Sequence, residues 1–387
     1  MIENKKKICP TCRAKADFLT DWKFSGFNDS IFNYTANFYE CKNCGLVYIQ
    51  NITDTRLAKF YSNECDYHDK GHFNILSVEN IKKYQFYKKM ILEENLSDIS
   101  IADIGCGRGG FLLWLEKNDW KAKCFGVDVD YKSIPEDDEV KLGVNFIKGS
   151  ATSLPFEDDT QVLLSYFHVL EHIKDIDLVL SESNRVLKDN GYILIEVPDA
   201  SRYDELPVGT AFWFGIREHI YHFSPKSLES SFLRNGFEIL KIEQNVLPTP
   251  EFEYPSLLVM AKKTDKKTDI KIGDKGSIAS FLKYSKDSLQ KQADQIIKMS
   301  LKDKKLVLWG CSAELFSLLP LLNKDALEIC DSSKLKQQSK YQGLEIIPPK
   351  DADKNSILVI APYLHSKAIK KNALELGWTE NDIVILK

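Results

Sequence analysis

The chain has 387 residues, and its hydrophobic fraction of 43% and charged fraction of 28% are ordinary for a globular protein of two or three domains. Its formal net charge of −4 provides no basic surface for a nucleic acid, so we expect no such partner. No apolar run approaches the length of a membrane span, and Met1–Lys7 lacks the apolar segment of a signal peptide. Nine cysteines, some in close pairs, are typical of a reducing compartment. We therefore expect a cytoplasmic protein without membrane contact.

Two short-spaced pairs of cysteines stand near the N-terminus. Cys9 and Cys12 form the first pair, and Cys41 and Cys44 form the second. Each pair can place two thiolates on one turn, and two such turns complete the tetrahedral shell of a structural zinc ion. A module this small needs such a cross-link to fold. The spacing therefore predicts a zinc-ribbon domain over residues 1–60, with unligated thiols as the alternative.

A helical connector is predicted over residues 61–95. It begins with a polar loop whose aromatic and imidazole side chains are Tyr61, Tyr67, His68 and His72. Such groups in a loop are suited to the mouth of a substrate site, and a solvated connector is an equal alternative. Ile75–Leu92 then has apolar residues at helical spacing, which predicts a helix that leads into the next domain.

Residues 101–112 are predicted to form a strand, a tight turn and the start of a helix. Gly105, Gly107 and Gly109 let the backbone turn sharply and approach a ligand closely. Asp128 ends the next predicted strand, about 20 residues on, where a carboxylate binds ribose hydroxyls. The spacing of Gly105, Gly107 and Gly110 also fits a dinucleotide. Asp103 favours S-adenosylmethionine instead, because a carboxylate before the turn repels a pyrophosphate and attracts the ammonium group of a methionine.

Alternating strands and helices over residues 96–262 predict a doubly wound, Rossmann-like α/β domain. Ligands of such a sheet lie at the carboxyl ends of its strands. The turn after the third strand, where adenine is expected, contains Ser150 and Ala151. The other expected cofactor contacts lie in the glycine turn, after the ribose acid and at the end of the fourth strand: Cys106, Val129, Phe167 and His168.

The loop over residues 198–225 is long and rich in functional side chains, as active-site loops often are. Within it, Glu218 and His219 offer an imidazole base with an acid beside it in sequence, and His222 follows. His172, after the fourth strand, is a second candidate for substrate contact or catalysis. For each histidine, the alternative is a buried imidazole that only stabilises the fold.

The remainder of the chain predicts a linker and a third domain. Residues 263–300 contain a charged linker and an amphipathic connecting helix over Ile278–Met299. Residues 301–387 begin a second strand-turn-helix unit and predict a C-terminal Rossmann-like α/β domain. Gly310 is the only glycine of its turn, which is too few to predict a second cofactor. The domain could form a wall of the substrate site, a dimer contact or a scaffold, so both a monomer and a homodimer remain open.

The run Asp103–Gly109 resembles the first motif of class I methyltransferases, and the resemblance extends over residues 96–262. With the zinc ribbon and the third domain, the whole chain resembles the sugar C-methyltransferases of deoxysugar biosynthesis. This resemblance implies a small-molecule substrate, a 4-keto sugar linked to a nucleotide. It also implies methylation at carbon 3 by S-adenosylmethionine, after a histidine base has formed an enolate.

The family carries its base on a Tyr-x-Glu-His element. Here Glu218 and His219 match that element, while Ile216 replaces the tyrosine. The resemblance further assigns His172 to the family's second histidine and Tyr67 to an upstream tyrosine. O-methylation of a saccharide or another surface-glycan precursor is the alternative reaction, because it needs only a base for a hydroxyl.

Overall fold

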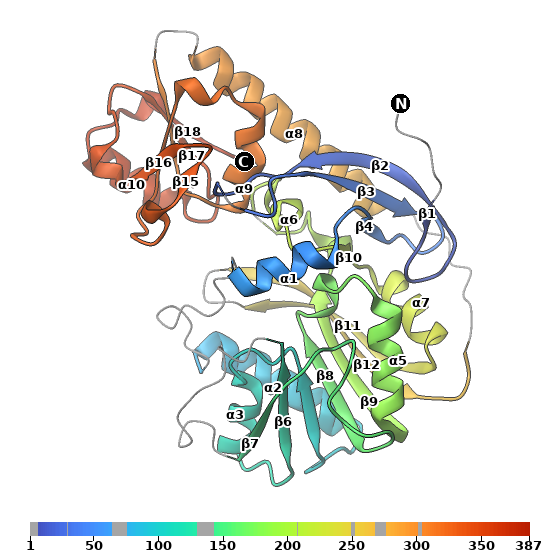
Figure 1. Ribbon diagram of the computed structural model, residues 1–387. Helices are drawn as coiled ribbons and strands as arrows, with labels where there is room; N and C mark the ends of the chain where they lie inside the picture. Colours follow the sequence, from blue (N-terminus) through green and yellow to red (C-terminus); the bar gives the residue numbers. More distant parts are fainter. Residues whose placement is uncertain are drawn as a thin grey trace.

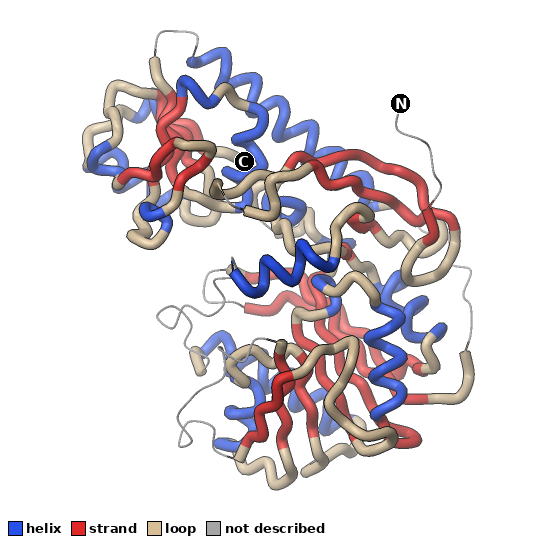
Figure 2. The backbone as a smooth tube through the Cα atoms, in the orientation of Figure 1, coloured by secondary structure: helices blue, strands red, loops and turns tan. Residues whose placement is uncertain are grey.

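A computed structural model describes residues 7–28, 30–63, 76–129, 143–206, 208–248, 252–267, 276–300 and 304–387. Within these residues the strands form three sheets of five, seven and six strands (Figure 1). Figure 2 shows them as an N-terminal β module, a central α/β unit and a C-terminal α/β unit. Of the helices described, none combines the length and apolar character needed to cross a membrane.

The N-terminal β module is an antiparallel sheet that includes one strand from far along the chain. Its strands pair in the order β1 (Lys7–Ile8), β2 (Lys15–Lys23), β3 (Thr35–Cys41), β4 (Val47–Ile49) and β10 (Tyr221–His222). In the last pair, Tyr221 lies opposite Tyr48 and His222 opposite Val47. The sequence did not predict that the loop over residues 198–225 would complete this sheet.

The central sheet has the mixed order of a doubly wound fold, so the predicted Rossmann-like architecture is confirmed. Its order is β11 (Phe237–Pro248), β12 (Glu253–Lys263), β9 (Leu187–Pro198), β8 (Gln161–Phe167), β5 (Ile101–Ile104), β6 (Cys124–Asp128) and β7 (Val144–Lys148). Only β12 runs antiparallel to its neighbours. The inner parallel strands β5 and β8 are buried along most of their length and are accordingly rich in Ile, Leu and Val.

Helices cover both faces of the central sheet (Figure 1). On one face lie α2 (Val78–Glu93) and α3 (Gly110–Lys117), and on the other α5 (Ile176–Val186) and α7 (Pro225–Arg234). Ser224 caps α7 through a capping box, which fixes where the preceding loop ends. Two shorter helices, α1 (Asp54–Asn63) and α6 (Phe212–Gly215), lie between the central sheet and the N-terminal β module.

The C-terminal unit has its own sheet, parallel except for β15. The order is β15 (Lys340–Tyr341), β16 (Leu344–Ile347), β14 (Leu327–Cys330), β13 (Leu306–Trp309), β17 (Ile357–Ile360) and β18 (Ile383–Ile385). Its α helices are α8 (Ser277–Ser300), α9 (Ala313–Leu318) and α10 (Ser366–Glu375). The described 3-10 helices are η3 (Leu170–His172), η4 (Ala200–Arg202), η5 (Leu319–Leu321), η6 (Lys324–Ala326), η7 (Lys336–Gln338), η8 (Pro349–Asp351) and η9 (Glu380–Asp382).

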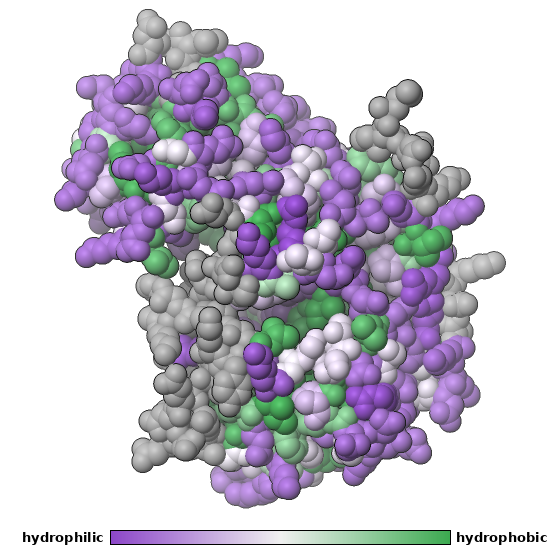
Figure 3. Space-filling view, in the orientation of Figure 1, coloured by the Kyte–Doolittle hydropathy of each residue, from purple (hydrophilic) through white to green (hydrophobic). Residues whose placement is uncertain are grey.

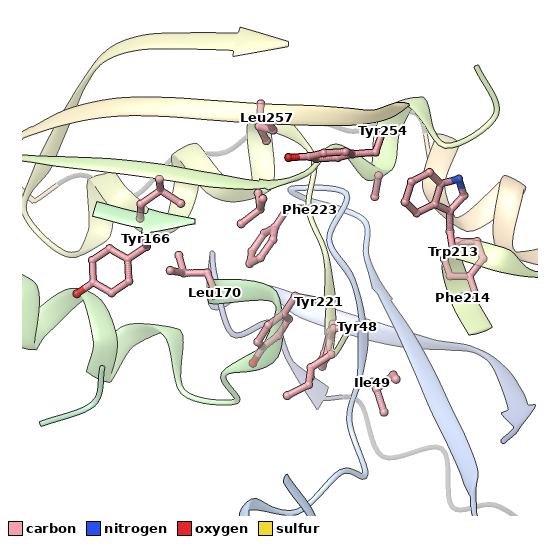
Figure 4. Close-up of a cluster of buried hydrophobic side chains, with 14 of the residues drawn as sticks. Tyr48, Ile49, Tyr166, Leu170, Trp213, Phe214, Tyr221, Phe223, Tyr254 and Leu257 are labelled. Carbon is pink, nitrogen blue, oxygen red and sulfur yellow. The ribbon is translucent and has the colours of Figure 1, made fainter. Parts of the chain in front are cut away.

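The N-terminal β module joins the central unit through a buried aromatic cluster. Figure 4 shows Tyr221 beside Tyr48, with Leu170 and Phe223 on its other side. All four side chains are buried, and the rings of Tyr221 and Tyr48 lie 6.3 Å apart. Because this packing removes apolar surface of both units from water, it fixes the module over the carboxyl ends of the central strands. The space-filling view is hollowed between these layers, with apolar residues at the floor of the hollow (Figure 3).

Candidate active site

The glycine loop follows β5 and adopts the backbone conformation that its sequence predicts. Gly105, Gly107 and Gly109 all have positive φ angles, of 71°, 53° and 71°. A Cβ at Gly105 would lie 2.5 Å from Cγ2 of Val169, so the loop packs tightly on that side. A Cβ at Gly107 would meet no atom within 4 Å. The loop is therefore closed toward the protein and open at Gly107, where a ligand can approach the backbone.

Asp128 lies at the end of β6, directly against this loop. Its Oδ2 accepts a 2.8 Å hydrogen bond from the N–H of Gly107. The next side chain, Val129, is half exposed. A carboxylate at the rim of an open glycine loop fits the paired hydroxyls of a ribose, which is the role expected for Asp128.

Asp103 lies beneath the loop and is almost completely buried. Its carboxyl group has a pKa raised to about 7, mainly by burial; a 2.8 Å hydrogen bond from Ser165 opposes the rise, and the nearby charge of Asp128 adds to it. No cation within the described residues compensates this carboxylate by an ion pair. A buried carboxylate in this state fits a ligand that brings an ammonium group.

The other expected cofactor contacts lie around the same edge of the sheet. The hydroxyl oxygens of Ser150 and Thr152 lie 2.8 Å apart and form a hydrogen bond within the turn. Ala151, between them, is buried. Phe167 stacks on Tyr87 of α2, with ring centroids 3.9 Å apart. Cys106 lies in the glycine loop, and a Cβ at Gly126 would meet its sulfur at 2.9 Å. Their contact with a cofactor stays a prediction.

A cluster of imidazoles surrounds Glu171 just after β8. This residue belongs to η3, and its side chain is completely buried. Its Oε1 lies 3.1 Å from Nδ1 of His168 and 3.8 Å from Nε2 of His172. The ring of His219 lies 4.8 Å from that of His172, nearly perpendicular to it. Since Val169 packs on Gly105, this cluster stands one turn away from the glycine loop.

His168, whose side chain is about a third exposed, forms a charged pair with the buried Glu196, at 3.6 Å. Burial opposes the charge on His168, but Glu196 and Glu171 overcome it and raise its pKa to about 9. Burial likewise opposes the charge on Glu196, but His168 helps to lower its pKa to about 2. Glu196 also accepts hydrogen bonds from three hydroxyl groups: those of Tyr87, Tyr254 and Ser256. His168, expected as a cofactor contact, is thus held mainly by protein groups.

His219 is buried, and within the described part of the chain its Nδ1 has no hydrogen-bond partner. Burial, together with the neighbouring histidines, holds its pKa well below the usual value, so the ring is neutral near pH 7. The carboxylate that lies in the cluster with His219 is Glu171, rather than its sequence neighbour Glu218. Glu218 instead contributes its backbone carbonyl, which accepts a 3.3 Å hydrogen bond from Nδ1 of His172.

His222 lies on β10 within the aromatic core. Its ring packs against those of Phe38, Tyr203 and Phe214, at centroid distances of 5.8, 5.9 and 4.8 Å. Burial lowers its pKa to about 3. This environment matches the alternative of a buried imidazole that stabilises the fold, and a catalytic role for His222 has no contact here to support it.

The expected tyrosine, Tyr67, lies outside the described residues, as do His68 and His72. Tyr61, expected at the start of the same loop, lies on α1 instead. Its ring is edge-on to that of His172, with the ring centroids 6.4 Å apart. Sequence reasoning missed Glu171. The available signal was its position between two histidines, three residues after His168 and next to His172, directly after a strand.

The four N-terminal cysteines converge as their spacing predicts. Their sulfur atoms all lie within 4.8 Å of one another, with Cys9 to Cys44 at 3.7 Å and Cys12 to Cys41 at 3.4 Å. A tetrahedral zinc ion with bonds of about 2.3 Å separates its sulfur ligands by about 3.8 Å. The thiols therefore fit a zinc ion and would fill its shell, which leaves no position for a substrate.

A family model described as a methyltransferase domain matches residues 57–242, just under half of the chain. This range includes the glycine loop and the histidine cluster. Among curated proteins, a sterol 4-C-methyltransferase of Caenorhabditis elegans is 30% identical over 125 residues, which cover 30% of this chain and 36% of that protein. A ubiquinone biosynthesis O-methyltransferase of Pelagibacter ubique is 29% identical over 130 residues, covering 32% and 53%.

The chain thus spans between about a third and about half of the length of these relatives. Among solved structures, the YcgJ protein of Bacillus subtilis is similar at 18% identity, with a TM-score of 0.39, over 47% of this chain and 99% of that one.

Proposed function

We propose that this chain, whose residues 57–242 form a class I, S-adenosylmethionine-dependent methyltransferase domain, methylates a small-molecule acceptor, a sugar linked to a nucleotide. The observation that supports this most is the position of the histidine cluster. Val169 packs on Gly105, Glu171 and His172 follow it within one turn, and the ring of His219 lies 4.8 Å from that of His172. A proton acceptor therefore lies beside the cofactor loop. This combination suits the removal of a proton from the atom that receives the methyl group.

The cofactor, when bound, supplies an electrophilic methyl group on sulfur. Asp128 would bind its ribose hydroxyls, and the buried carboxylate of Asp103 would attract its ammonium group. The open side of Gly107 leaves room for the ligand against the backbone. Ser150, Ala151 and the residues after β8 would complete the cofactor site.

The proposed reaction is C-methylation beside a ketone. His219 is neutral near pH 7 and has an unpartnered ring nitrogen, so it can take the proton from the carbon. The electron pair of the broken C–H bond moves to the ketone oxygen and forms an enolate. The enolate carbon then forms a bond to the methyl group, whose bond to sulfur breaks. The proton remains on the imidazole until it returns to solvent.

O-methylation is the second candidate, because Ile216 stands where the sugar C-methyltransferases have a tyrosine. Ile216 offers no hydroxyl to bind a ketone or an enolate oxygen. A hydroxyl acceptor needs only a base, which His219 also provides. The zinc ion is proposed as structural in both cases, bound by Cys9, Cys12, Cys41 and Cys44. We also propose the domain limits given above. We further propose that the chain acts as a monomer or a homodimer and does not bind a nucleic acid.

The test uses a nucleotide-linked 4-keto sugar in heavy water, with the full chain and S-adenosylhomocysteine, followed by mass spectrometry. Uptake of deuterium beside the ketone that depends on the protein is expected for C-methylation. Absence of uptake, in a preparation shown to bind S-adenosylhomocysteine, would leave O-methylation as the reaction. A chain that does not bind the cofactor product at all would contradict both candidates.

The variant His219→Ala tests the base. It should reduce turnover by about 100-fold or more, the usual scale for a general base, and change the affinity for S-adenosylhomocysteine little. Full turnover in this variant would exclude His219 as the base. The control variant is Lys241→Ala. Lys241 lies on β11, away from the histidine cluster, and pairs with Glu93 of α2, so its removal should leave turnover unchanged.

A further inference from the structure

Glu171 is a buried carboxylate with an incomplete set of partners. One of its oxygens, Oε1, faces the imidazoles of His168 and His172 at 3.1 and 3.8 Å. The other oxygen, Oε2, is buried and has no hydrogen-bond donor within the described residues. An unpaired polar atom in the interior costs free energy, so such an atom needs an explanation.

The neighbouring carboxylate, Glu196, makes the contrast clear. It is equally buried, yet three hydroxyl groups donate to it and the charges of His168 and Lys83 lie nearby. His168 contacts both carboxylates, at 3.1 Å for Glu171 and 3.6 Å for Glu196. In the described part of the chain, the other imidazole within 4 Å of Glu171 is that of His172, at 3.8 Å. Oε2 of Glu171 can therefore accept one more hydrogen bond, or face one more positive charge.

The missing donor can come from the two imidazoles on its open side. Nδ1 of His172 donates to the carbonyl of Glu218, which leaves Nε2 of a neutral His172 without a proton, facing Glu171 at 3.8 Å. His219 has an unpartnered Nδ1, and its ring is adjacent to that of His172. Ligand-type atoms of Glu171, His172 and His219 all lie within 4.8 Å of one another.

We propose that Glu171 is the positioning residue of this site: it orients His172 and stabilises the positive charge that the His172–His219 pair gains when it takes the acceptor's proton. The inference rests on the proposed function, because that function supplies the proton. One proton moves from the acceptor to an imidazole nitrogen, and its bonding electrons stay on the acceptor.

Other charged and titratable groups lie around Glu171 and the pair, on the surrounding elements. These are His168 on the turn before η3, Glu196 on β9, Tyr254 on β12, Tyr203 after η4, Tyr61 on α1, Glu218 in the preceding loop and His222 on β10. Among them, His168 carries a positive charge that opposes protonation of the pair. Glu171 is the carboxylate positioned between that charge and the pair.

The experiment measures the protonation of His172 and His219 directly, by NMR titration of the full chain with isotope-labelled histidine. Signals are assigned with His172→Gln and His219→Gln. In Glu171→Gln, the titration midpoint of at least one of the two rings should fall by about 1–3 pH units, the effect of removing an opposite charge at this distance. Glu171→Asp, which keeps the charge, should retain most of the midpoint.

Two further variants serve as comparisons. Glu182→Gln removes a carboxylate that pairs with Arg185 on α5, in the same domain, and should leave both midpoints unchanged. Glu218→Gln keeps the backbone carbonyl that binds His172, so its shift should be smaller than that of Glu171→Gln. Circular dichroism and thermal unfolding establish that each variant is folded. If Glu171→Gln does not fold, the titration midpoints of His172 and His219 are compared between Glu171→Asp and the unchanged chain.

Three results would overturn the proposal: equal midpoints in Glu171→Gln and the unchanged chain, no titration of either ring, or a larger shift in Glu218→Gln. A metal ion bound by the unchanged chain in excess of the one for the four cysteines, and lost in Glu171→Gln, would overturn it too. The proposed function is tested separately, by deuterium uptake. A shifted midpoint without uptake would retain the role of Glu171 and reject C-methylation.

Discussion

The N–H of Gly107 donates a 2.8 Å hydrogen bond to Oδ2 of Asp128 and so joins the glycine loop to the end of the neighbouring strand. Asp128→Asn retains the shape of the side chain and removes the charge. The variant should bind S-adenosylhomocysteine about 10- to 100-fold more weakly, because hydrogen bonds to charged groups contribute about 1.5–3 kcal/mol. Isothermal titration calorimetry measures this loss, and Asp158→Asn, on an exposed residue, is the control. Unchanged affinity would exclude Asp128 from the cofactor site.

The buried carboxyl of Asp103 should make cofactor binding depend on pH. Its pKa of about 7 in the ligand-free chain means that the group is largely protonated below neutrality. An ammonium group favours the ionised form, so affinity for S-adenosylhomocysteine should rise with pH to about 7 and then level off. Binding measured from pH 5.5 to 8.5 tests this, and Asp103→Asn should bind weakly with a flatter profile. Affinity that falls over the same range would contradict the assignment.

The same group affects the stability of the ligand-free chain. Because its pKa in the folded chain lies above the ordinary 3.8, its protonated form favours folding at low pH. That contribution is fully present below about pH 4 and is lost as the pH rises to about 7. Added S-adenosylhomocysteine should reverse the loss, which thermal unfolding at pH 7 with and without ligand would detect.

His222 should make the fold sensitive to acid. Its pKa of about 3 in the folded chain lies below the ordinary 6.5, so its neutral form stabilises the chain above pH 6.5. This contribution is lost as the pH falls toward 3, with a slope of up to about 1.4 kcal/mol per pH unit. His222→Phe, which suits the rings of Phe38 and Phe214, should reduce that slope in urea unfolding between pH 6.5 and 4.5. An unchanged slope would assign the acid sensitivity to other groups.

The cysteine cluster should be required for the N-terminal β module to fold. Replacing Cys41 and Cys44 by Ser should abolish zinc binding and unfold this module, because binding of structural zinc supplies folding free energy. Metal analysis and near-ultraviolet circular dichroism measure the two effects. Cys311→Ser, in the C-terminal unit, is the matched control. A folded double variant would contradict the structural role of the ion.

Local sequence patterns predicted the glycine turn after β5 and the strand that precedes it well. Glycine spacing and a buried apolar run specify the turn after β5, because only a few backbone conformations allow it. Asp103 and Asp128 follow from the position of each residue at the end of its strand. The spacing of the cysteines predicted that the four thiols converge for a similar reason. Each pair lies on one turn, so the sequence analysis had to infer only that the two turns approach each other.

The acceptor side was predicted less well, because it depends on contacts between distant segments. Glu218 is the sequence neighbour of His219, but neighbouring side chains need not share a direction, and the contact of Glu218 with His172 is made by its backbone carbonyl. Glu171 reaches the same place from η3. The strand β10 is only two residues long, too short to give a periodic signal, and its pairing with β4 follows from tertiary packing.

The addition of β10 to a sheet that begins at Lys7 also determines when that sheet can close during synthesis. The N–H of Ile49 donates a 2.8 Å hydrogen bond to the carbonyl of Ile220, so the partner of β4 leaves the ribosome about 170 residues after β4 itself. Elongation proceeds at about 5–20 residues per second. For that interval of many seconds, one edge of the nascent sheet stays unpaired and open to association with other chains. Premature termination before residue 221 would leave that edge permanently exposed.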